Sequence, residues 1–188
     1  MRYKTLIPWI APLALLFLSV NAQAQLTFDK PKEKPPLNNP YTLNLARPEL
    51  AKATDDILKG CKIEMDTVQT NLEKGRFVTK PWVFVKGLNT RTDLEYVSRL
   101  PASEARNWLR GRYYLEIILL PFDSKTSQIQ VIAHVEGQMV DGVGTKWIES
   151  PSNGRIEDEV LRALAGKILG LDLNPKPNMK RRIMDCEF

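Results

Sequence analysis

The sequence is poor in the residues that most often carry catalysis or bind metals. It has one histidine, His134, and two cysteines, Cys61 and Cys186, among 188 residues. No pattern in the sequence gives this single histidine a partner for a metal site or a nucleophilic triad, so we expect His134 to be solvated on the polar side of a strand. The absence of a Cys-x-x-Cys pair removes the usual motif for dithiol redox catalysis.

Motifs for phosphate binding and for acid–base chemistry are also missing. The run Asp141-Gly142-Val143-Gly144 lacks the lysine and the serine or threonine of a P-loop, so it predicts a hairpin turn. The carboxylates of Asp55, Asp56 and Glu64 follow no pattern that places two of them across a cleft, and we expect them to be solvated. The sequence therefore predicts no catalytic, cofactor-binding or metal-binding residue and indicates a non-enzymatic protein.

The first segment has the layout of a cleavable secretory signal. Two basic residues near the start precede an apolar stretch over residues 5–20, and Ala22-Gln23-Ala24 is a small-x-small site. We expect cleavage after Ala24 and a periplasmic or secreted location. Because the apolar stretch is short for a bilayer span, a retained N-terminal anchor is the weaker alternative. No cysteine lies near the cut to carry a lipid.

Removal of residues 1–24 leaves only a mild positive charge. The full chain has 27 Lys and Arg against 22 Asp and Glu, and loss of two basic residues gives 25 minus 22, or +3. Such a balance gives no reason to expect nucleic acid as a partner. The basic run Lys180, Arg181 and Arg182 could contact anionic lipid headgroups, although three basic residues on a tail are usually just solvated.

The two cysteines predict a disulfide. An exported chain meets an oxidising compartment, where an even pair of thiols tends to become linked. A Cys61–Cys186 bond would close a long loop, and the chain-entropy model assigns such a loop up to about 4 to 5 kcal/mol. The alternative is a free, buried Cys61 and a free Cys186 on a loose tail.

The strongest structural signal is a β-hairpin within residues 112–140. Apolar side chains at Leu115, Ile117 and Leu119 recur with period two, which is typical of a half-buried strand. The same period returns after the turn-forming run PFDSKTS, with polar residues between the apolar ones. Two such runs joined by a short polar connection predict an antiparallel hairpin at the centre of a sheet. The apolar positions of the second run are Ile129, Val131, Ala133 and Val135; the polar ones are Gln128, Gln130, His134 and Glu136.

Two amphipathic helices and further strands are expected around the hairpin. One helix covers residues 48–59, with Leu50, Thr54, Ile57, Leu58 and Cys61 on its apolar stripe. The other follows a cap at Ser152 or Asn153 and ends at Gly170. Its predicted apolar face carries Ile156, Val160, Leu161, Leu164, Ile168 and Leu169; its outer face carries Asp158, Glu159, Arg162 and Lys167. Strands are predicted at 61–67, at 76–85 with Pro81 marking an edge or bulge, and at 145–148.

The remaining segments give weaker signals. Residues 25–47 carry many prolines and predict an extended, mostly mobile linker that could serve as a spacer or lie along a partner. Residues 88–110 resemble an insertion, with strand character at Leu94, Tyr96 and Val97. A short helix is expected from a Ser103 cap through Leu109, its inner side formed by Ala105, Trp108 and Leu109. The domain is expected to span 48–170, and 171–188 to form a basic tail.

Aromatic residues gather near the sheet segments. We expect most of them to be core or sheet-edge packing, and a minority could line a groove. They are Trp82, Trp108, Tyr113, Tyr114 and Trp147.

The order of these features resembles one family. It runs Gly60-Cys61-Lys62-Ile63, a turn with Gly75, Thr79 to Trp82, Arg112 to Leu115, Ser127 to Val131, Trp147 and a last helix. This order is similar to the helix-grip domains of envelope lipoproteins typified by BamC of the outer-membrane β-barrel assembly machinery. The resemblance covers residues 48–169 and implies a sheet wrapped on a helix, no enzymatic residues and protein contact at the envelope. The lipid-carrying cysteine of that family is absent from this sequence.

The sequence therefore predicts an α+β domain with a four- or five-stranded antiparallel sheet and two helices on one face. The function it favours is an exported, non-enzymatic interaction or scaffold protein of the cell envelope. One alternative is a periplasmic domain that binds a small ligand or lipid in an apolar cavity. An exported hydrolase would need a cleft that brings His134 together with a serine and an acid.

Overall fold

The two longest strands of the protein are neighbours in the sequence. The computed structural model describes residues 35–100 and 107–173. Strand β4 (Trp108–Pro121) and strand β5 (Ser127–Asp141) pair antiparallel, from Pro121 opposite Ser127 to Trp108 opposite Met139. This confirms the predicted hairpin, which extends beyond the predicted strands at its open end.

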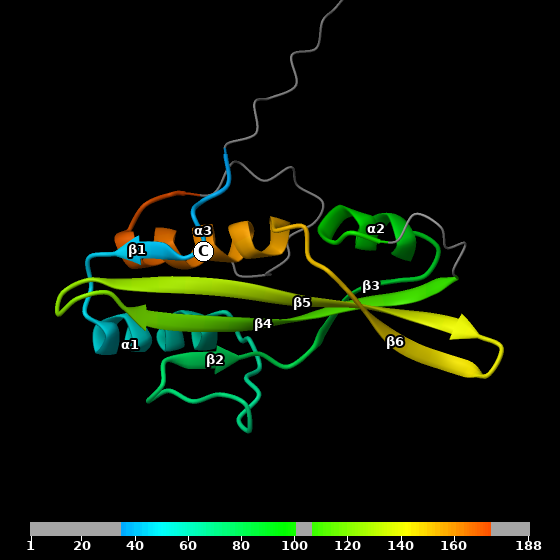
Figure 1. Ribbon diagram of the computed structural model, residues 1–188, viewed down its shortest axis with the longest axis horizontal. Coiled ribbons are helices and arrows are strands. Elements are labelled where there is room, and N and C mark those ends of the chain that lie inside the picture. Colours follow the sequence, from blue (N-terminus) through cyan, green and yellow to red (C-terminus); the bar gives the residue numbers. More distant parts are fainter. Residues whose placement is uncertain (1–34, 101–106, 174–188) are drawn as a thin grey trace, which may run out of the picture. The chain divides into compact units, whose positions relative to one another are not determined.

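Four short strands flank the hairpin and complete an antiparallel sheet (Figure 1). Strands β1 (Tyr41–Leu43) and β6 (Gly144–Ser150) pair with β5. Strands β2 (Arg76–Val78) and β3 (Trp82–Lys86) pair with β4. The predicted α+β class and antiparallel sheet are confirmed, but the described residues form six strands where four or five were expected.

Three helices accompany the sheet, where two were expected. They are α1 (Arg47–Gly60), α2 (Thr90–Val97) and α3 (Arg155–Leu169). Leu50 and Leu58 of α1 join Val160 and Leu164 of α3 in one buried cluster with the odd-numbered side chains of β4 and β5. Among the residues that the structure describes, no helix is long and apolar enough to cross a membrane.

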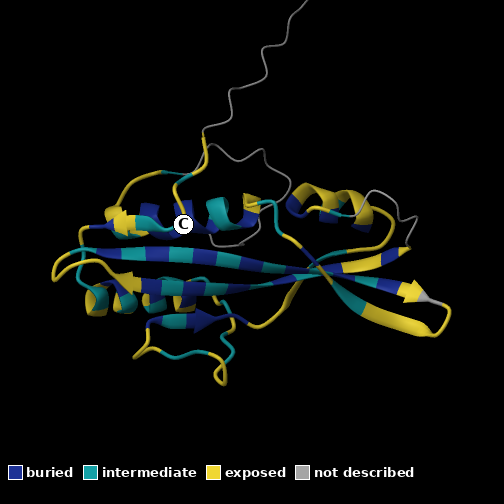
Figure 2. Ribbon diagram, in the orientation of Figure 1, coloured by how far each residue is buried: buried dark blue, intermediate teal, exposed yellow. Residues whose placement is uncertain are grey.

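The two faces of the β4–β5 hairpin differ along its whole length. Odd-numbered side chains from Tyr113 to Leu119 and from Ile129 to Val135 are buried, and we call this side the inner face. Even-numbered side chains between them are half-buried, and we call that side the outer face. Figure 2 shows the alternation as dark and teal bands along both strands. The period of two that predicted the hairpin therefore also assigns its two faces.

A side chain closes the gap on each edge of the hairpin. Between β1 and β6, the Asn39 amide donates to the carbonyl of Val131 (2.6 Å) and accepts from its N–H (3.1 Å). Between β2 and β3, the N–H of Thr79 donates to the carbonyl of Leu115 (2.9 Å), and its hydroxyl accepts the N–H of Leu115 (2.9 Å). Both side chains satisfy backbone groups that an interrupted strand would leave unpaired.

The predicted strand at 61–67 is wrong, and the predicted strand at 76–85 is divided. Lys62 has a φ of 56°, a left-handed conformation that ends the extended run, and only an isolated bridge from Met65 to Thr79 remains. Pro81 has no N–H to give to a ladder, and the chain leaves the sheet between β2 and β3.

The expectations for residues 88–110 are corrected in two places. Residues 90–97 form a helix and not a strand, because Thr90, Leu94 and Val97 recur at helical spacing and are all buried. Trp108 and Leu109, expected at the end of a helix, belong to β4. Ser103 and Ala105 lie outside the described residues.

The folded part of the chain extends into both the predicted linker and the predicted tail. Residues 41–43 form β1, and Leu43 is buried, so the folded part reaches into the expected linker. At the other end, Leu173 accepts a hydrogen bond from Arg162 (3.3 Å), and Pro35 accepts a second one (2.6 Å). Arg162, expected to point to solvent, is buried and holds both ends of the described chain beside α3.

Helix α3 differs from the prediction in two further details. Its N-cap is Gly154, while Ser152 and Asn153 accept the N–H groups of Gly154 (3.1 Å) and Arg155 (3.2 Å). Leu169, expected on the buried face, is 43% exposed. The predicted end at Gly170, which adopts a left-handed conformation, is confirmed.

Candidate functional site

The outer face carries a row of paired polar and aromatic side chains, which we take as the candidate site. Directly opposed positions across β4 and β5 bring Arg112 to Glu136 and Tyr114 to His134. Adjacent strands add Arg76 from β2 and Trp147 from β6. Cross-strand pairs of this kind fix each other's rotamers and stabilise the sheet locally.

Arg112 is held between a carboxylate and an aromatic ring. Its Nε donates to a carboxylate oxygen of Glu136, and its guanidinium carbon lies 4.0 Å from the centre of the Trp147 ring. About a quarter of the Arg112 side chain remains exposed, 27%. A guanidinium stacked on an indole gains a cation–π contact and keeps free N–H groups that can donate to a partner.

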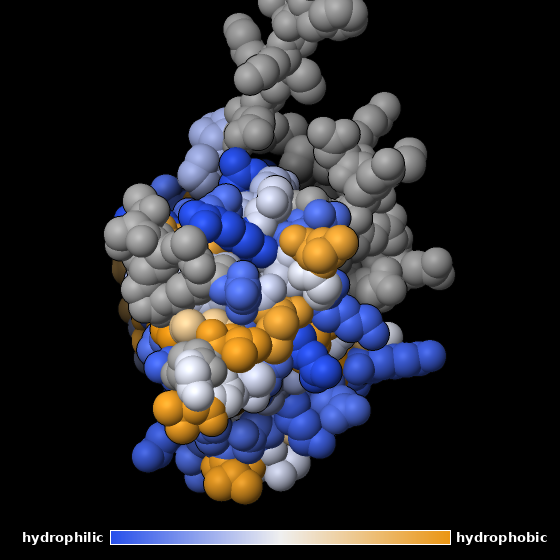
Figure 3. Space-filling view, turned by 90° about the vertical axis from the view of Figure 1, so that its right-hand side faces the viewer, coloured by the Kyte–Doolittle hydropathy of each residue, from blue (hydrophilic) through white to orange (hydrophobic). Residues whose placement is uncertain are grey.

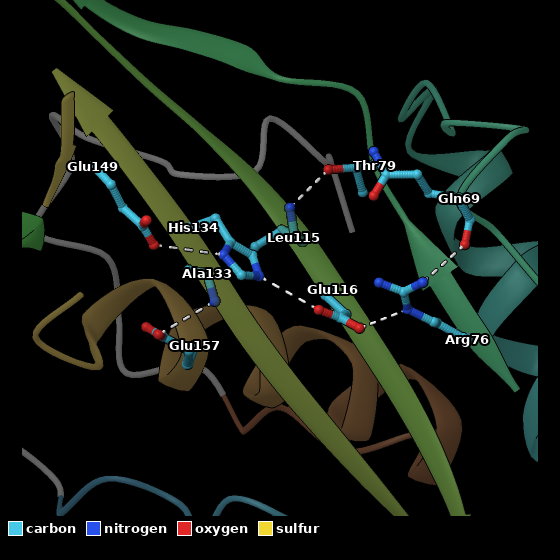
Figure 4. Close-up of polar contacts among 9 residues, drawn as sticks. All are labelled: Gln69, Arg76, Thr79, Leu115, Glu116, Ala133, His134, Glu149 and Glu157. Carbon is cyan, nitrogen blue, oxygen red and sulfur yellow. Dashed lines mark hydrogen bonds and ion pairs between the residues drawn. The ribbon is translucent and has the colours of Figure 1, made fainter. Parts of the chain in front are cut away.

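Tyr114 and His134 form the next pair. Their rings lie 4.4 Å apart and are nearly parallel, at 8°. The imidazole Nε2 lies 3.4 Å from Oε2 of Glu116, and its Nδ1 lies 4.0 Å from Oε1 of Glu149 (Figure 4). His134 is therefore half-buried and stacked, and not solvated as the sequence suggested.

Glu116 connects this pair to β2. Its Oε1 accepts a hydrogen bond from Nε of Arg76 (2.6 Å). Another nitrogen of the same guanidinium, Nη1, donates to the carbonyl of Gln69 (3.5 Å). Burial alone raises the pKa of Glu116, but the hydrogen bonds and charges of Arg76 and His134 outweigh it and hold this pKa below its ordinary value. Glu116 therefore stays ionised at neutral pH.

The pKa of Tyr114 moves the other way. Burial raises it, and the negative charges of Glu136, Glu149 and Glu116 raise it further. The phenol therefore stays protonated and remains a hydrogen-bond donor at neutral and moderately alkaline pH. The outer face thus offers donors from tyrosine and arginine beside fixed carboxylates.

The described neighbours of His134 do not include the nucleophile that acyl transfer requires. The described partners of His134 are Tyr114, Glu116 and Glu149, and none of them is a serine or a thiol that could act as a nucleophile. Within residues 35–100 and 107–173, no three His, Cys, Asp or Glu side chains gather as they would around a metal ion.

Two shallow grooves lie beside α3. One, of about 340 Å³, is lined by Leu37, Asn39, Glu157 and Asp158 among others. Its carboxylates are occupied: Glu157 accepts from the N–H of Ala133 (3.3 Å), and Asp158 accepts from the N–H of Leu37 (2.7 Å). The second groove, of about 480 Å³, lies between β1 and the end of α3.

The carboxylates of Asp55, Asp56 and Glu64 do not converge on a common site. Asp55 pairs with Lys59 (2.6 Å) on α1, and Glu64 pairs with Lys80 (3.0 Å). Asp56 is exposed on the same helix. The expected turn at 141–144 joins β5 to β6 and is confirmed.

The predicted aromatic group is divided between the two faces. Tyr114 and Trp147 belong to the outer face described above. Trp82 packs edge-on against Tyr113 at 5.6 Å, and Trp108 lies over Gly137 on the inner face. The expectation that most aromatic residues pack in the core or at a sheet edge thus fits Trp82, Trp108 and Tyr113.

The disulfide, the cleavage site and the basic run are not described by the structure. Cys61 follows the last turn of α1, where its N–H donates to the carbonyl of Ile57 (2.9 Å). Its predicted partner Cys186, the cleavage residue Ala24 and the run Lys180, Arg181 and Arg182 lie outside the described residues. These statements stay predictions.

Sequence reasoning missed the pairing of the outer-face residues, although a signal for it was present. From Arg110 to Pro121, paired residue numbers in the hairpin add to a constant, as in Pro121 opposite Ser127 and Tyr114 opposite His134. The turn-forming run at 121–127 therefore could have placed Arg112 opposite Glu136. The contributions of Arg76 and Trp147 depend on strands that join the hairpin from elsewhere in the chain, and no local pattern shows them.

Comparison with known proteins finds no relative of this chain. No family model matches the chain, and neither a curated protein nor a solved structure does. The resemblance to BamC-like helix-grip domains therefore stays a prediction from the sequence.

Proposed function

We propose that this chain is an exported protein of the cell envelope that acts by binding another protein through the outer face of its sheet. The observation that carries the proposal is the row formed by Arg112, Trp147, Tyr114 and His134. Arginine, tryptophan and tyrosine are the residues on which binding energy concentrates at protein interfaces. Export is supported by the signal-like segment at 1–24, and the helix-grip resemblance points to the same kind of role.

The geometry supports protein recognition in a second way. The side chains of the row already hold one another through ion pairs and ring stacking, as between Arg112 and Glu136. Little rotamer entropy is then lost when a partner binds, and this lowers the cost of association. The inner face cannot serve in this way because α1 and α3 cover it.

Site-specific photo-crosslinking in envelope extracts tests the proposal. A benzophenone amino acid replaces Ile118 on the outer face, and a matched variant carries it at Lys52, which is exposed on α1. We expect a discrete adduct from position 118 that the additional substitution Trp147→Ala abolishes, and no such adduct from position 52. Equal labelling from both positions, or an adduct insensitive to Trp147→Ala, would contradict the proposal.

A second candidate function is binding of a small apolar ligand in the groove between β1 and α3. Its volume of about 480 Å³ lies in the range of ligand pockets, and Leu43, Leu45 and Ile168 supply apolar lining. A fluorescent fatty-acid probe should bind in a manner that Ile168→Asp abolishes and Leu171→Asp, outside the lining, does not. Binding that both variants retain would exclude this groove.

The disulfide is proposed together with export. Non-reducing peptide mapping of the exported protein should recover Cys61 and Cys186 in one linked fragment. Recovery of two separate free thiols would exclude it.

Contact of Lys180, Arg181 and Arg182 with anionic lipid would appear as salt-sensitive binding to vesicles that contain phosphatidylglycerol and not to neutral vesicles.

A further inference from the structure

Strand β3 presents an edge to which no other described segment pairs. The edge of β2 is covered, because the backbone N–H of Lys80 donates to the carbonyl of Glu64 (2.8 Å) and the N–H of Asp66 donates to the carbonyl of Val78 (2.8 Å). This cover stops before Pro81. Strand β3 itself pairs only with β4 among the described residues, so its other row of backbone groups can accept a further strand.

The side chains of β3 are unusually apolar for a sheet edge. Trp82 is 46% exposed and Val83 is 42% exposed. The register shifts between Val83 and Val85, and the bulge allows Phe84 and Val85 both to reach Gly111, which has no side chain to exclude them. An added strand would therefore find apolar surface on both sides of the sheet, at Trp82 inside and at Val83 outside.

The charge beside this edge has one sign. Lys86 stands directly opposite Arg110 across β3 and β4. Both are exposed, and neither forms an ion pair with an acidic group of the described chain. Like charges directly opposed across two strands are unfavourable, so a carboxylate brought beside Lys86 at the free edge would be stabilised by both.

The same charges decide which strand is accepted. A second copy of β3 would bring another Lys86 and Arg110 to this edge, and lysines on edge strands are a known protection against such self-pairing. The C-terminal segment from residue 174 is itself rich in lysine and arginine and contains two prolines. An acidic partner meets neither obstacle, because opposite charge attracts it and disfavours the alternatives.

The end of the molecule that carries the β5–β6 turn is seen in Figure 3. Hydrophobic side chains appear there as separate patches among hydrophilic ones, and not as one continuous apolar surface. This favours recognition of a short segment over burial in a large apolar interface.

We propose that β3 binds an extended, acidic segment of a partner protein by strand addition, with alternating apolar and acidic side chains. The backbone of the segment pairs with Trp82–Lys86. Its apolar side chains pack beside Trp82 on the inner side of the sheet, and its carboxylates lie on the outer side next to Lys86, with Arg110 one strand further in. This inference names an edge separate from the outer-face row and does not require that row to bind anything.

Fluorescence anisotropy with labelled peptides on the full chain tests the inference. The probe is Asp-Val-Glu-Val-Asp-Val-Glu, compared with a peptide in which lysines replace the acids and with one methylated on alternate backbone nitrogens. We expect the acidic peptide to bind about tenfold more tightly than the lysine peptide, with affinity that falls as salt rises. We expect methylation to weaken binding about tenfold, because strand addition needs those N–H groups.

Two double variants complete the design. Lys86→Glu with Arg110→Glu should reverse the charge preference, whereas Lys52→Glu with Lys125→Glu, which makes the same change in net charge elsewhere, should leave it intact. Trp147→Ala should retain peptide binding even where it abolishes the outer-face adduct, so the two proposals fail separately.

Three results would overturn the inference. Equal binding of the methylated peptide would indicate a contact through charge alone. Equal affinity for the acidic and the lysine peptide would show that Lys86 and Arg110 do not select the partner by charge. Concentration-dependent dimerisation that Lys86→Glu with Arg110→Glu alters would identify a second copy as the occupant.

Discussion

The inner and outer faces of the β4–β5 hairpin are built from alternate residues of the same strands but serve different purposes. Ile117 is fully buried beneath the helices, while its neighbours Glu116 and Ile118 are half-buried on the other side. The inner face is apolar and continuous with the helices. The outer face is a set of cross-strand pairs that no helix or strand of the described residues covers.

This difference separates the residues that stabilise the fold from those of the proposed recognition surface along one strand. Burial of apolar surface on the inner face supplies the main driving force for folding. The outer-face pairs are partly solvated, and exposed ion pairs contribute only up to about 1 kcal/mol each. Outer-face residues can therefore change without loss of the fold, as a recognition surface requires.

The largest expected difference between the inner and outer faces comes from truncating two adjacent isoleucines. Ile117→Ala should lower the free energy of unfolding by about 3 to 4 kcal/mol, because it leaves a cavity in the core. Ile118→Ala, one residue along and half-buried, should lower it by about 1 kcal/mol. Urea denaturation of both variants measures the contrast, and equal losses would show that the faces are not distinct.

Addition of a single methyl group to the inner face should also be costly. A Cβ at Gly137 would lie 2.2 Å from a ring carbon of Trp108, so Gly137→Ala must displace the indole. Overpacking of this kind costs about 1 to 3 kcal/mol. The control is Gly142→Ala in the β5–β6 turn, where a Cβ meets nothing within 4 Å. In thermal unfolding, the midpoint temperature of this control should stay close to that of the wild type.

One substitution on the covered side should stabilise the protein. The Thr54 hydroxyl on α1 is buried and has no hydrogen-bond partner among the described residues. Thr54→Val keeps the shape and removes an unsatisfied polar group, so we expect a gain of about 1 kcal/mol in urea denaturation. A loss of stability would mean that the hydroxyl is bonded in solution.

The smallest effect concerns acid stability of the outer face. The pKa of Glu116 is lowered in the folded protein, so its contribution to stability is present above the ordinary carboxyl value of 4.5 and is lost as pH falls through the folded value. Glu116→Gln should therefore be less stable than wild type at neutral pH, with a difference that shrinks below about pH 4.5.

Chemical denaturation across this pH range checks the sign. Glu64→Gln, which changes a solvent-exposed pair with Lys80, is the matched control and should show no comparable shrinkage. A difference for Glu116→Gln that stays constant or grows in acid would contradict the assigned linkage.

The sequence predicted what depends on local period and turn chemistry. Alternation at Leu115, Ile117 and Leu119 was sufficient for the hairpin, and helical spacing was sufficient for α1 and α3. The α2 segment was misassigned because Leu94 and Tyr96, two residues apart, imitate a strand, although Thr90, Leu94 and Val97 are the residues that are buried.

The remaining errors concern contacts between segments distant in sequence. Arg162 lies on a face where solvent was expected, and it is buried because the carbonyls of Pro35 and Leu173 approach it. The pairing of Glu116 with Arg76 depends in the same way on β2 joining the hairpin. Neither contact leaves a pattern in the local sequence, so hydrophobic periodicity cannot predict it.

The most direct test of the central claim measures partner binding by the outer face at constant fold. The double variant Arg112→Ala with Trp147→Ala should lose binding of the crosslinked envelope partner by at least about tenfold while its urea midpoint stays close to wild type. Ile117→Ala, studied where it is still folded, should bind normally. Undiminished binding by the double variant would show that the outer face is not the recognition surface.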